Sequence, residues 1–321
     1  MRMVMSSPDD WAARIGRRLR LRDLGVLVTV AREGTMAKAA HRLSISQPAV
    51  SKAIADLEAN LGLKLFDRGP QGVRPTLYGE ALLARSVAAF DELHQAVREL
   101  DYLSHRTAGE VRLGCNESLA AALLPAVVRT LNDEHPGLTL HVTQMSRPIT
   151  EEARRLRDRE VEFIIARGVF AVPEDDLDVE LLFEEPLLLI AGAASRWATD
   201  PPNGLADLLT APWVLYPPGE PPGTLVDEAF RAQGLPPPDR GVTTSSFYLR
   251  QQLLETGDYV TVAPRCMLAV FNARQPTVAA LPIDLGIALR PVAIYTLRNR
   301  TLSPLARTTI DTVRSTSTGL R

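Results

Sequence analysis

Apolar residues return every three or four positions in several separate segments of this 321-residue chain. In the segment from residue 21 to residue 33 they are Leu24, Leu27, Val28 and Ala31, which share one side of a helix. This spacing matches the 3.6 residues of a helical turn and predicts an amphipathic helix. The segment is the first of three helical patterns in the N-terminal part of the chain.

Two shorter helical patterns follow, and a polar turn separates them. Thr35 stands at the N-cap position of the first pattern, and the second begins at Ser46. The start of the second pattern carries Gln47, Ser51 and Lys52, which suit contacts with base edges and phosphates. Two short helices at a tight turn predict a helix-turn-helix whose second helix enters the major groove. A helical hairpin that only packs against the rest of the protein is the alternative interpretation.

Two extended segments come next, at residues 65–68 and 72–75, and a Gly-Pro-Gln-Gly turn joins them. Extended segments around such a turn predict a two-stranded wing. Arg68 and Arg74 lie on these segments, where a wing reaches phosphate or the minor groove. At each of the two positions, an arginine that is merely solvated is the alternative.

Residues 77–103 have a helical pattern without a break. Within it, seven positions follow a strict alternation of four and three, which is the signature of a coiled-coil seam and predicts pairing with a second copy. A helix that packs on its own C-terminal domain is the alternative interpretation. The seam positions are Leu82, Ser86, Ala89, Leu93, Ala96, Leu100 and Leu103.

Strand and helix patterns alternate in the rest of the chain, which predicts an α/β domain with a mostly parallel sheet. The predicted strands are 111–115, 138–144 and 161–166, and the predicted helices are 119–134 and 150–159. A second α/β unit runs from residue 186 to about residue 281, with strands near 187–191, 213–216 and 259–263. The chain then returns through 288–296 to a last helix at 303–314.

Over residues 34–68 the chain resembles the N-terminal domain of LysR-type transcriptional regulators. The length and organisation of the remaining sequence agree with that family, so the resemblance covers nearly the whole chain. The residues that carry it are Gly34, Ala39, Ala40, Leu43, Ser46, Gln47, Pro48, Ala49, Ser51, Leu57, Glu58, Leu61, Gly62, Leu65, Phe66 and Arg68.

The resemblance implies an α+β multidomain protein: an N-terminal winged helix-turn-helix, a long linker helix that dimerises the heads, and a C-terminal two-lobed α/β domain like a periplasmic binding protein. The expected domains are an N-terminal extension at 1–18, a DNA-binding domain at 19–76 and a linker at 77–106, with the helix-turn-helix at about 36–55. The effector-binding domain is expected at 107–321. Its lobe I covers about 107–184 and 288–321, and its lobe II covers about 185–287. The expected DNA-binding residues are Thr35, Ser46, Gln47, Pro48, Ser51, Lys52, Arg68 and Arg74, with Pro48 shaping the start of the recognition helix.

Ligands of such sheets bind at the carboxyl ends of the strands and between the lobes, so residues that follow predicted strands are candidates for effector binding. Arg167 favours a carboxylate or phosphate ligand, whereas Glu117, if it points inward, favours sugar hydroxyls. The polar loop 115–118 is similar to the branch of the family named for regulating a galactose-binding protein. The candidates are Asn116, Glu117, Ser118, Ser146, Arg167, Gly168, Tyr216, Ser245 and Ser246.

The net charge of −2 does not indicate a nucleic-acid binder, but its distribution does. Residues 1–76 hold 13 Lys and Arg against 7 Asp and Glu, whereas the remainder holds 23 against 31. A basic head on an acidic body suits one DNA-facing domain attached to a second domain. The charge distribution thus favours DNA as a partner, and the resemblance implies the full set: double-stranded DNA with two-fold symmetric sites, a second copy in a dimer or tetramer, a small-molecule effector, and RNA polymerase.

The two cysteines, Cys115 and Cys266, are too few and too distant for a disulfide scaffold or a zinc site, and they indicate a reducing compartment. No apolar run reaches the length of a membrane span, and residues 1–20 lack the apolar core of a signal peptide. We therefore expect a cytoplasmic protein. Two interpretations of residues 1–18 remain, a disordered basic arm or an upstream start codon.

Functions from other classes have weaker support. No HExxH, phosphate-cradling Gly-Lys loop, CxxC or Ser between spaced glycines is present, and the five histidines are scattered. We therefore expect no enzymatic activity and no cofactor, although a few enzymes share the binding-protein fold. A redox-responsive regulator that uses Cys115 and Cys266 is the other alternative.

Overall fold

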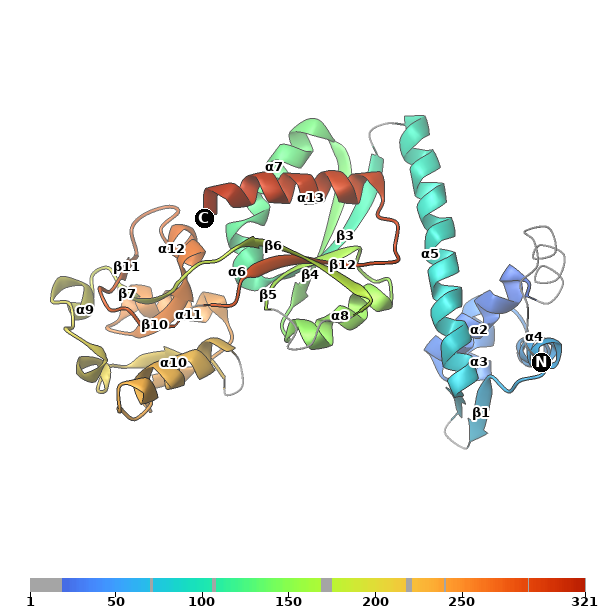
Figure 1. Ribbon diagram of the computed structural model, residues 1–321, viewed down its shortest axis with the longest axis horizontal. Coiled ribbons are helices and arrows are strands. Elements are labelled where there is room, and N and C mark those ends of the chain that lie inside the picture. The colour runs from blue at the N-terminus through green and yellow to red at the C-terminus, as the bar shows by residue number, and fades with distance from the viewer. Residues whose placement is uncertain are drawn as a thin grey trace. The chain divides into compact units, whose positions relative to one another are not determined.

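A computed structural model describes residues 19–69, 72–105, 108–168, 175–217, 221–239, 241–287 and 289–320 (Figure 1). The chain divides into two compact units, Met1–Val97 and Arg98–Arg321. The predicted N-terminal extension, residues 1–18, lies outside the described residues, as does the centre of the predicted wing turn, residues 70–71.

The first unit is a three-helix head with a wing. Its elements are α2 (Leu21–Glu33), α3 (Met36–Leu43), α4 (Gln47–Leu61), β1 (Phe66–Gly69) and β2 (Gly72–Pro75). The apolar sides of the three helices form one core that includes the fully buried Leu27, Val30, Val50 and Ile54. The two strands pair antiparallel, and the start of the first one completes this core with Leu65 and Phe66. The periodicity of the sequence therefore corresponds to the buried side of each helix.

The turns of the head are held by short-range capping. Gly34 ends α2 in the left-handed region with φ 71°, and the side chain of Thr35 then accepts a hydrogen bond from the backbone N–H of Lys38 at 3.2 Å. Ser44 adopts φ 54° after α3, and Ser46 caps α4 by accepting from the N–H of Ala49 at 3.4 Å. Thr35 and Ser46 thus satisfy backbone donors at the starts of α3 and α4, and the left-handed residues Gly34 and Ser44 turn the chain between the helices.

The linker helix α5 (Leu77–His105) begins directly after the wing. Thr76 caps it by accepting from the N–H of Gly79 at 3.1 Å, and its own hydroxyl donates to the carbonyl oxygen of Lys64 at 2.7 Å. Gly79 is buried, and a Cβ there would meet the carbonyl oxygen of Leu65 at 2.1 Å. The start of α5 therefore packs closely on the wing, and only glycine permits that approach.

The predicted seam on α5 does not behave as one continuous face. Leu82 packs against the core of the head and Ser86 is buried, so this end of the pattern serves the first unit itself. Further along, Leu93 is 46% exposed and Val97 56% exposed, and Leu100 follows at 65%. The exposed part of the predicted seam is therefore Ala89, Leu93, Ala96 and Leu100, and Val97 adds a further exposed apolar side chain beside it. The last seam position, Leu103, lies outside the residues whose side chains the structure describes.

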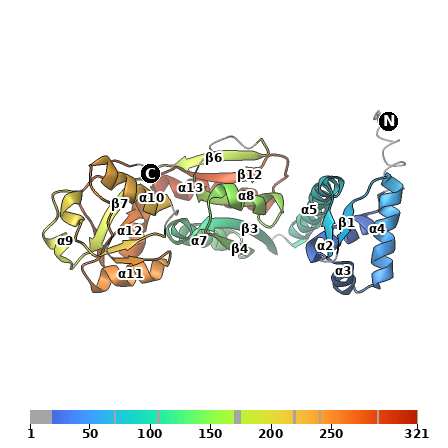
Figure 2. The ribbon, with the colours of Figure 1, turned by 90° about the horizontal axis from the view of Figure 1, so that it is seen from below.

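The second unit contains two sheets, each with helices packed against it (Figures 1 and 2). The elements of lobe I are β3 (Ala108–Asn116), α6 (Glu117–Ala122), α7 (Leu124–Glu134), β4 (Gly137–Met145), α8 (Ile149–Arg157), β5 (Phe163–Arg167), β6 (Leu177–Phe183), β12 (Val292–Leu297), α13 (Pro304–Ser317) and η2 (Thr318–Leu320). The strand order is β4-β3-β5-β12-β6, with β4, β3 and β5 parallel and β12 antiparallel to both of its neighbours. Helices α7 and α13 share the core on one face of this sheet, and α8 packs on the other.

Lobe II is built from the middle of the chain. Its elements are β7 (Leu187–Gly192), α9 (Arg196–Thr199), η1 (Leu205–Leu208), β8 (Trp213–Leu215), α10 (Pro221–Ala232), β9 (Gly241–Thr243), α11 (Phe247–Thr256), β10 (Val260–Pro264), α12 (Arg265–Phe271) and β11 (Val278–Ala280). The strand order is β11-β7-β10-β8-β9, with β10, β8 and β9 parallel and β7 antiparallel to both of its neighbours. Gly241 has φ 137°, and a Cβ there would lie 1.7 Å from the carbonyl oxygen of Trp213, so glycine is required where β9 pairs with β8.

The chain crosses between the lobes twice, after β6 and before β12. The predicted fold class, a winged helix-turn-helix, a long helix and a two-lobed α/β domain, is confirmed. In detail the sheets are more mixed than predicted, because β12 runs antiparallel to its neighbours β5 and β6, and β7 runs antiparallel to its neighbours β10 and β11.

One predicted helix and several missing elements need correction. The helix expected over 119–134 is divided into α6 and α7 at Leu123, because Pro125 occupies the first turn of α7 and cannot continue a preceding helix. The strand predicted at 111–115 is longer in the structure, where β3 covers Ala108–Asn116. The strand predicted at 161–166 is shifted, because β5 covers Phe163–Arg167. The sequence interpretation missed β6, α9, η1, α10, β9, α12 and β11.

Candidate functional site

The candidate DNA-binding residues lie at the start of α4 and on the wing. Gln47, Pro48 and Lys52 are exposed on the first two turns of α4, and Ser51 between them is half-buried. Thr35 and Ser46 act as caps, so their hydroxyls already accept backbone hydrogen bonds within the head. A hydroxyl that accepts such a bond keeps its own O–H donor, so Thr35, Ser46 and Ser51 stay candidates beside the exposed Gln47 and Lys52.

The wing presents its two arginines to solvent. Arg68 lies opposite Val73, and Arg74 lies opposite Asp67, in the antiparallel pair of β1 and β2. Both arginine side chains belong to exposed residues. An exposed guanidinium on a two-stranded ribbon suits contact with phosphate or with the minor groove.

Glu58 connects the wing to α4, a role that the sequence interpretation missed. It is buried, and its carboxylate accepts from the backbone N–H of Leu65 at 2.8 Å and of Phe66 at 3.3 Å, and from Lys64 Nζ at 2.9 Å. Burial of this carboxyl acts to raise its pKa, but the bonds from Lys64 and the two backbone groups outweigh it and hold the pKa below the ordinary value. Glu58 therefore remains ionised at neutral pH and fixes the wing relative to α4.

The carboxyl ends of β3, β4 and β5 meet at Asn116. Its side-chain amide donates to the carbonyl oxygen of Met145 at 3.3 Å, and its side-chain oxygen accepts from the backbone N–H of Arg167 at 3.3 Å. Three candidates from the sequence, Asn116, Ser146 and Arg167, are therefore brought to one edge of the lobe I sheet. The side chain of Asn116 is itself engaged in holding the strand ends together.

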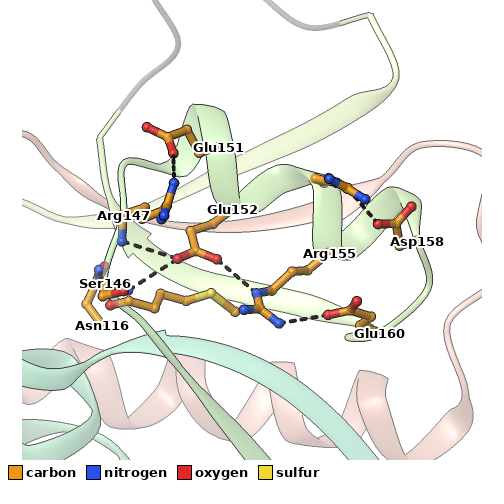
Figure 3. A network of polar contacts seen from close by, with 10 residues as sticks. Asn116, Ser146, Arg147, Glu151, Glu152, Arg155, Asp158 and Glu160 are labelled. Atoms are coloured by element: carbon orange, nitrogen blue, oxygen red, sulfur yellow. Dashed lines mark hydrogen bonds and ion pairs between the residues drawn. The ribbon is translucent and has the colours of Figure 1, made fainter. Parts of the chain in front are cut away.

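The loop that follows β4 is filled by a carboxylate of the protein. Glu152, buried near the start of α8, accepts from the backbone N–H of Ser146 at 3.3 Å and of Arg147 at 3.2 Å (Figure 3). Its other oxygen accepts from Arg155 Nε at 2.9 Å, and Arg155 in turn donates to Glu160. The backbone donors beside Ser146 thus serve this internal network rather than a ligand.

Arg167 is also engaged by a carboxylate of the protein. Its Nη2 donates to the carboxylate of Glu185, with which it forms a buried ion pair, and its Nη1 donates to the hydroxyl of Ser118 at 2.9 Å. The sulfur of Cys266 lies 3.5 Å from the same Nη2. The expectation that Arg167 offers an open charge to an anionic ligand must therefore be revised, because Glu185 already balances that charge. Gly168 follows at φ 131°, and its carbonyl oxygen accepts from the Tyr295 hydroxyl.

A buried arginine organises the strand ends of lobe II. Arg250, on α11, is 1% exposed, and its guanidinium donates to the carbonyl oxygens of Val214 at 3.1 Å and Thr244 at 2.7 Å and to the Thr261 hydroxyl at 2.8 Å. Its guanidinium carbon also lies 3.7 Å from the ring centroid of Tyr216. One side chain therefore ties together β8, β10 and the residue that follows β9, and these three strands are adjacent in the sheet. No sequence signal marked it.

The remaining candidates of lobe II surround this arginine. Ser245 and Ser246 are exposed between β9 and α11, and the Ser246 hydroxyl caps α11 by accepting from the N–H of Leu249 at 3.3 Å. From lobe I, Glu117 lies close enough for its charge to interact with that of Arg250: partial burial raises the pKa of Glu117, and Arg250 opposes part of that rise. Glu117, Tyr216, Ser245 and Ser246 are thus grouped around Arg250.

Both cysteines are free and buried. Burial raises the pKa of the Cys115 thiol to about 12, and burial together with the charge of Glu185 raises that of Cys266 to about 12, while Arg167 lowers both in part. A thiol with such a pKa is almost entirely protonated at neutral pH, and the thiolate is the reactive form. These surroundings are unfavourable to a redox sensor.

We expect alkylation of Cys115 and Cys266 by iodoacetamide to be slow in the folded protein between pH 7 and pH 9, because the thiolate fraction grows only as the pH approaches about 12. The same protein in urea should react rapidly, since unfolding returns both thiols to their ordinary pKa. Mass spectrometry of the alkylated peptides measures both rates. Rapid alkylation of the folded protein at pH 7 would favour the redox alternative.

Among the helices that the structure describes, none combines the length and the apolar character that a bilayer span requires. Nor do the described residues gather three or more His, Cys, Asp or Glu side chains in a metal-binding arrangement.

An exposed winged helix-turn-helix joined to a two-lobed α/β sensor domain defines a DNA-binding transcriptional regulator with an effector-sensing domain. Residues 21–80 match the family model described as bacterial regulatory helix-turn-helix protein, lysR family, and residues 104–318 match the LysR substrate binding domain. The chain therefore belongs to the LysR family, as its sequence predicted. This family consists of transcriptional regulators rather than enzymes.

Individual proteins agree with this assignment. The regulator GbpR of Azospirillum brasilense is 31% identical over 313 residues, which cover 97% of this chain and 90% of GbpR. The regulator YdcI of Escherichia coli strain K12 is 32% identical over 298 residues, covering 93% and 96% of the two chains. A full-length OxyR variant from Pseudomonas aeruginosa has the same fold, with a TM-score of 0.64 at 22% identity over 93% of this chain and 94% of OxyR. The LysR-family regulator CbnR in complex with its target DNA has a TM-score of 0.59 at 21% identity, covering 93% and 100%.

Proposed function

We propose that this regulator binds two-fold symmetric promoter DNA as a homodimer or homotetramer in the cytoplasm. The observation that carries the proposal is the start of α4, where Gln47 and Lys52 are exposed while the caps and the core below hold the helix rigidly in the head. A rigid helix start with free donors is suited to base edges in the major groove. Its relative CbnR has been solved in complex with target DNA, which supports the same use of the head here.

The dimer would form through α5, whose exposed stripe Leu93, Val97 and Leu100 is apolar and faces away from the head core. Pairing two heads joins two half-site contacts into one binding event, which raises the overall affinity without any new contact at the DNA. RNA polymerase is a further partner in this proposal, because a regulator at a promoter acts on transcription through it.

The effector would be a small molecule bound near Glu117, Tyr216, Ser245 and Ser246, which the structure groups around Arg250 from both lobes. Polar groups at the carboxyl ends of strands, supplied by two lobes, are the usual setting of a ligand site in such folds. No cofactor other than this effector is proposed. Binding would act by changing how the lobes pack and therefore how the dimer presents its heads.

The test of DNA binding is sequencing of genomic fragments retained by the purified protein at a stated, near-physiological salt concentration. We expect a small number of intergenic fragments that share a two-fold symmetric motif. The genes beside them would then indicate which metabolites to test as effectors. Retention that is diffuse and lost with modest salt would contradict specific recognition, since sequence-independent binding rests on phosphate contacts alone.

Two single substitutions should separate base readout from phosphate contact. Gln47→Ala should weaken binding to the motif by roughly 1–3 kcal/mol and leave binding to random DNA unchanged. Arg74→Ala should weaken binding to both DNAs equally and lower the slope of log affinity against log salt by about one. Fluorescence anisotropy with motif and scrambled duplexes measures both effects. Equal losses on both duplexes for Gln47→Ala would show that this residue does not read bases.

A further inference from the structure

Arg167 lies where groups of lobe I, lobe II and the crossing between them meet. It ends β5 of lobe I and bonds to Ser118 at the start of α6. Its ion-pair partner, Glu185, lies between β6 and β7, on the first chain crossing from lobe I to lobe II. The other oxygen of Glu185 accepts from the backbone N–H of Cys266 in α12 of lobe II at 2.7 Å. One carboxylate therefore binds both lobes at once.

The surroundings of Glu185 are those of a bound carboxylate ligand. Its side chain is 1% exposed, and each of its oxygens has a donor, the Arg167 guanidinium on one side and a backbone N–H on the other. Withdrawing a carboxylate from water to this extent is unfavourable unless such donors replace the water. The donors come from elements distant in sequence, so the fold builds a carboxylate site and fills it with its own side chain.

Glu185 does not use all the hydrogen-bond donors of the Arg167 guanidinium. Its Nε is buried, and among the described residues no group accepts a hydrogen bond from it. A guanidinium offers Nε and Nη2 as a parallel pair of donors that matches the two oxygens of a carboxylate. Glu185 uses only Nη2 of this pair, because its other oxygen is directed to Cys266. A carboxylate that approached side-on would satisfy Nε as well.

The same contact lies beside the packing of the two lobes against each other. Ala121 and Ala122 of α6 in lobe I pack against the apolar cluster that contains Cys266 and Met267 of α12. At the C-terminal end of the chain, the carbonyl oxygen of Leu320 accepts from Arg265 Nη2 at 2.9 Å. Release of Glu185 from Cys266 would therefore loosen α12 from α6 rather than only uncap a helix.

We propose that Glu185 is an internal carboxylate ligand of Arg167 that latches lobe II onto lobe I, and that a carboxylate-bearing effector acts by replacing it. This inference rests on the proposed effector-sensing function and specifies its chemistry. An effector carboxylate would take the Nε and Nη2 donors of Arg167, displace Glu185, and free the N–H of Cys266. The lobes then change their packing because a buried charged group that bonds to both of them has moved.

The test is hydrogen exchange on the full-length protein, measured by mass spectrometry for peptides that span α6 and α12. Glu185→Ala should increase exchange in both peptides at least about tenfold, the change expected from loss of a charge-assisted hydrogen bond. Acetate matches the atoms that this substitution removes. Sodium acetate at roughly 50 mM, the concentration range that a weak carboxylate site requires, should therefore restore protection. Sodium chloride at the same ionic strength should not.

The matched control is Glu152→Ala, which removes another buried carboxylate that accepts two backbone N–H groups in lobe I. It should raise exchange around residues 146–147 and leave α12 protected. If Glu185→Ala increases exchange in α12 alone, Glu185 only caps that helix, and the proposal that it holds the two lobes together is wrong. Absence of acetate protection would overturn the carboxylate site.

If Glu185→Ala fails to fold, as judged by circular dichroism, Glu185→Gln replaces it, because the amide keeps the volume and removes the charge. It should show the same joint rise in α6 and α12, and unchanged exchange in both would overturn the proposal. Retention of specific DNA fragments by the wild-type protein is measured separately. Loss of that retention counts against the proposed function, whereas an unresponsive latch with specific DNA binding intact counts against this inference alone.

Discussion

Leu93→Glu should convert the protein to a monomer and reduce its affinity for a two-fold symmetric operator by at least about 100-fold, the lower range of the gain from joining two binding modules. Leu93 is 46% exposed on α5 and lies one turn from Val97, which is 56% exposed. A charge placed in an apolar helix pair must be buried without a partner, which disfavours the pair strongly. Sedimentation and operator binding at equal protein concentrations measure the two effects.

Leu77→Glu is the matched control for this prediction. Leu77 is 78% exposed on the same helix, but sixteen positions earlier, which places it on nearly the opposite side from Leu93. The same change there should leave the protein dimeric and operator binding within about twofold, as expected for a surface substitution. A Leu93→Glu protein that stays dimeric would contradict pairing through this stripe.

Arg250→Met should lower the stability of the second unit by about 2–4 kcal/mol, because three acceptors, two of them in buried hydrogen bonds, lose a charged donor at once. Methionine retains much of the length and apolar volume of arginine, so the loss reports the polar contacts to Val214, Thr244 and Thr261 rather than a cavity. In a unit of this size the midpoint of thermal unfolding should fall by roughly 5–15 °C. Trp197 and Trp213 both lie in lobe II, so tryptophan fluorescence follows its unfolding.

Arg231→Met provides the control in the same lobe. Arg231 pairs with Asp227 on the surface of α10 at 3.5 Å, and its side chain is 63% exposed. Exposed pairs of this kind contribute little, so the midpoint should change by no more than about 2 °C. Similar losses for both arginines would show that the buried contacts of Arg250 have no special importance.

The head was predictable almost residue by residue, because its structure depends on interactions between residues that are close in the sequence. Thr35 and Ser46 cap helices through bonds to groups three residues away, and the core of the head follows helical periodicity. The seam on α5 was predictable only in part. Its spacing is regular throughout, but Leu82 is partly buried against the core of the head and Ser86 is buried, whereas Leu93 is exposed. The spacing alone does not say which surface packs against each part of the seam.

The short elements of the second unit were missed for a related reason. β9 and β11 each have three residues, too few to show alternation, and β6 buries only Leu177 and its last two residues. Strands of this kind form because a neighbouring strand supplies hydrogen bonds and burial. A pattern within the segment therefore could not distinguish them from loops.

By itself, the sequence determined the family, the order of the domains, the caps and buried faces of the head, and which strand ends carry polar residues. All of these depend on residue identity within a few positions. Only the tertiary structure decided that Arg167 is paired with Glu185 and touches Cys266, 99 positions away, and that Arg250 joins three neighbouring strands. These contacts depend on which strands become neighbours in a sheet, and the pairing of distant strands leaves no periodic trace in the chain.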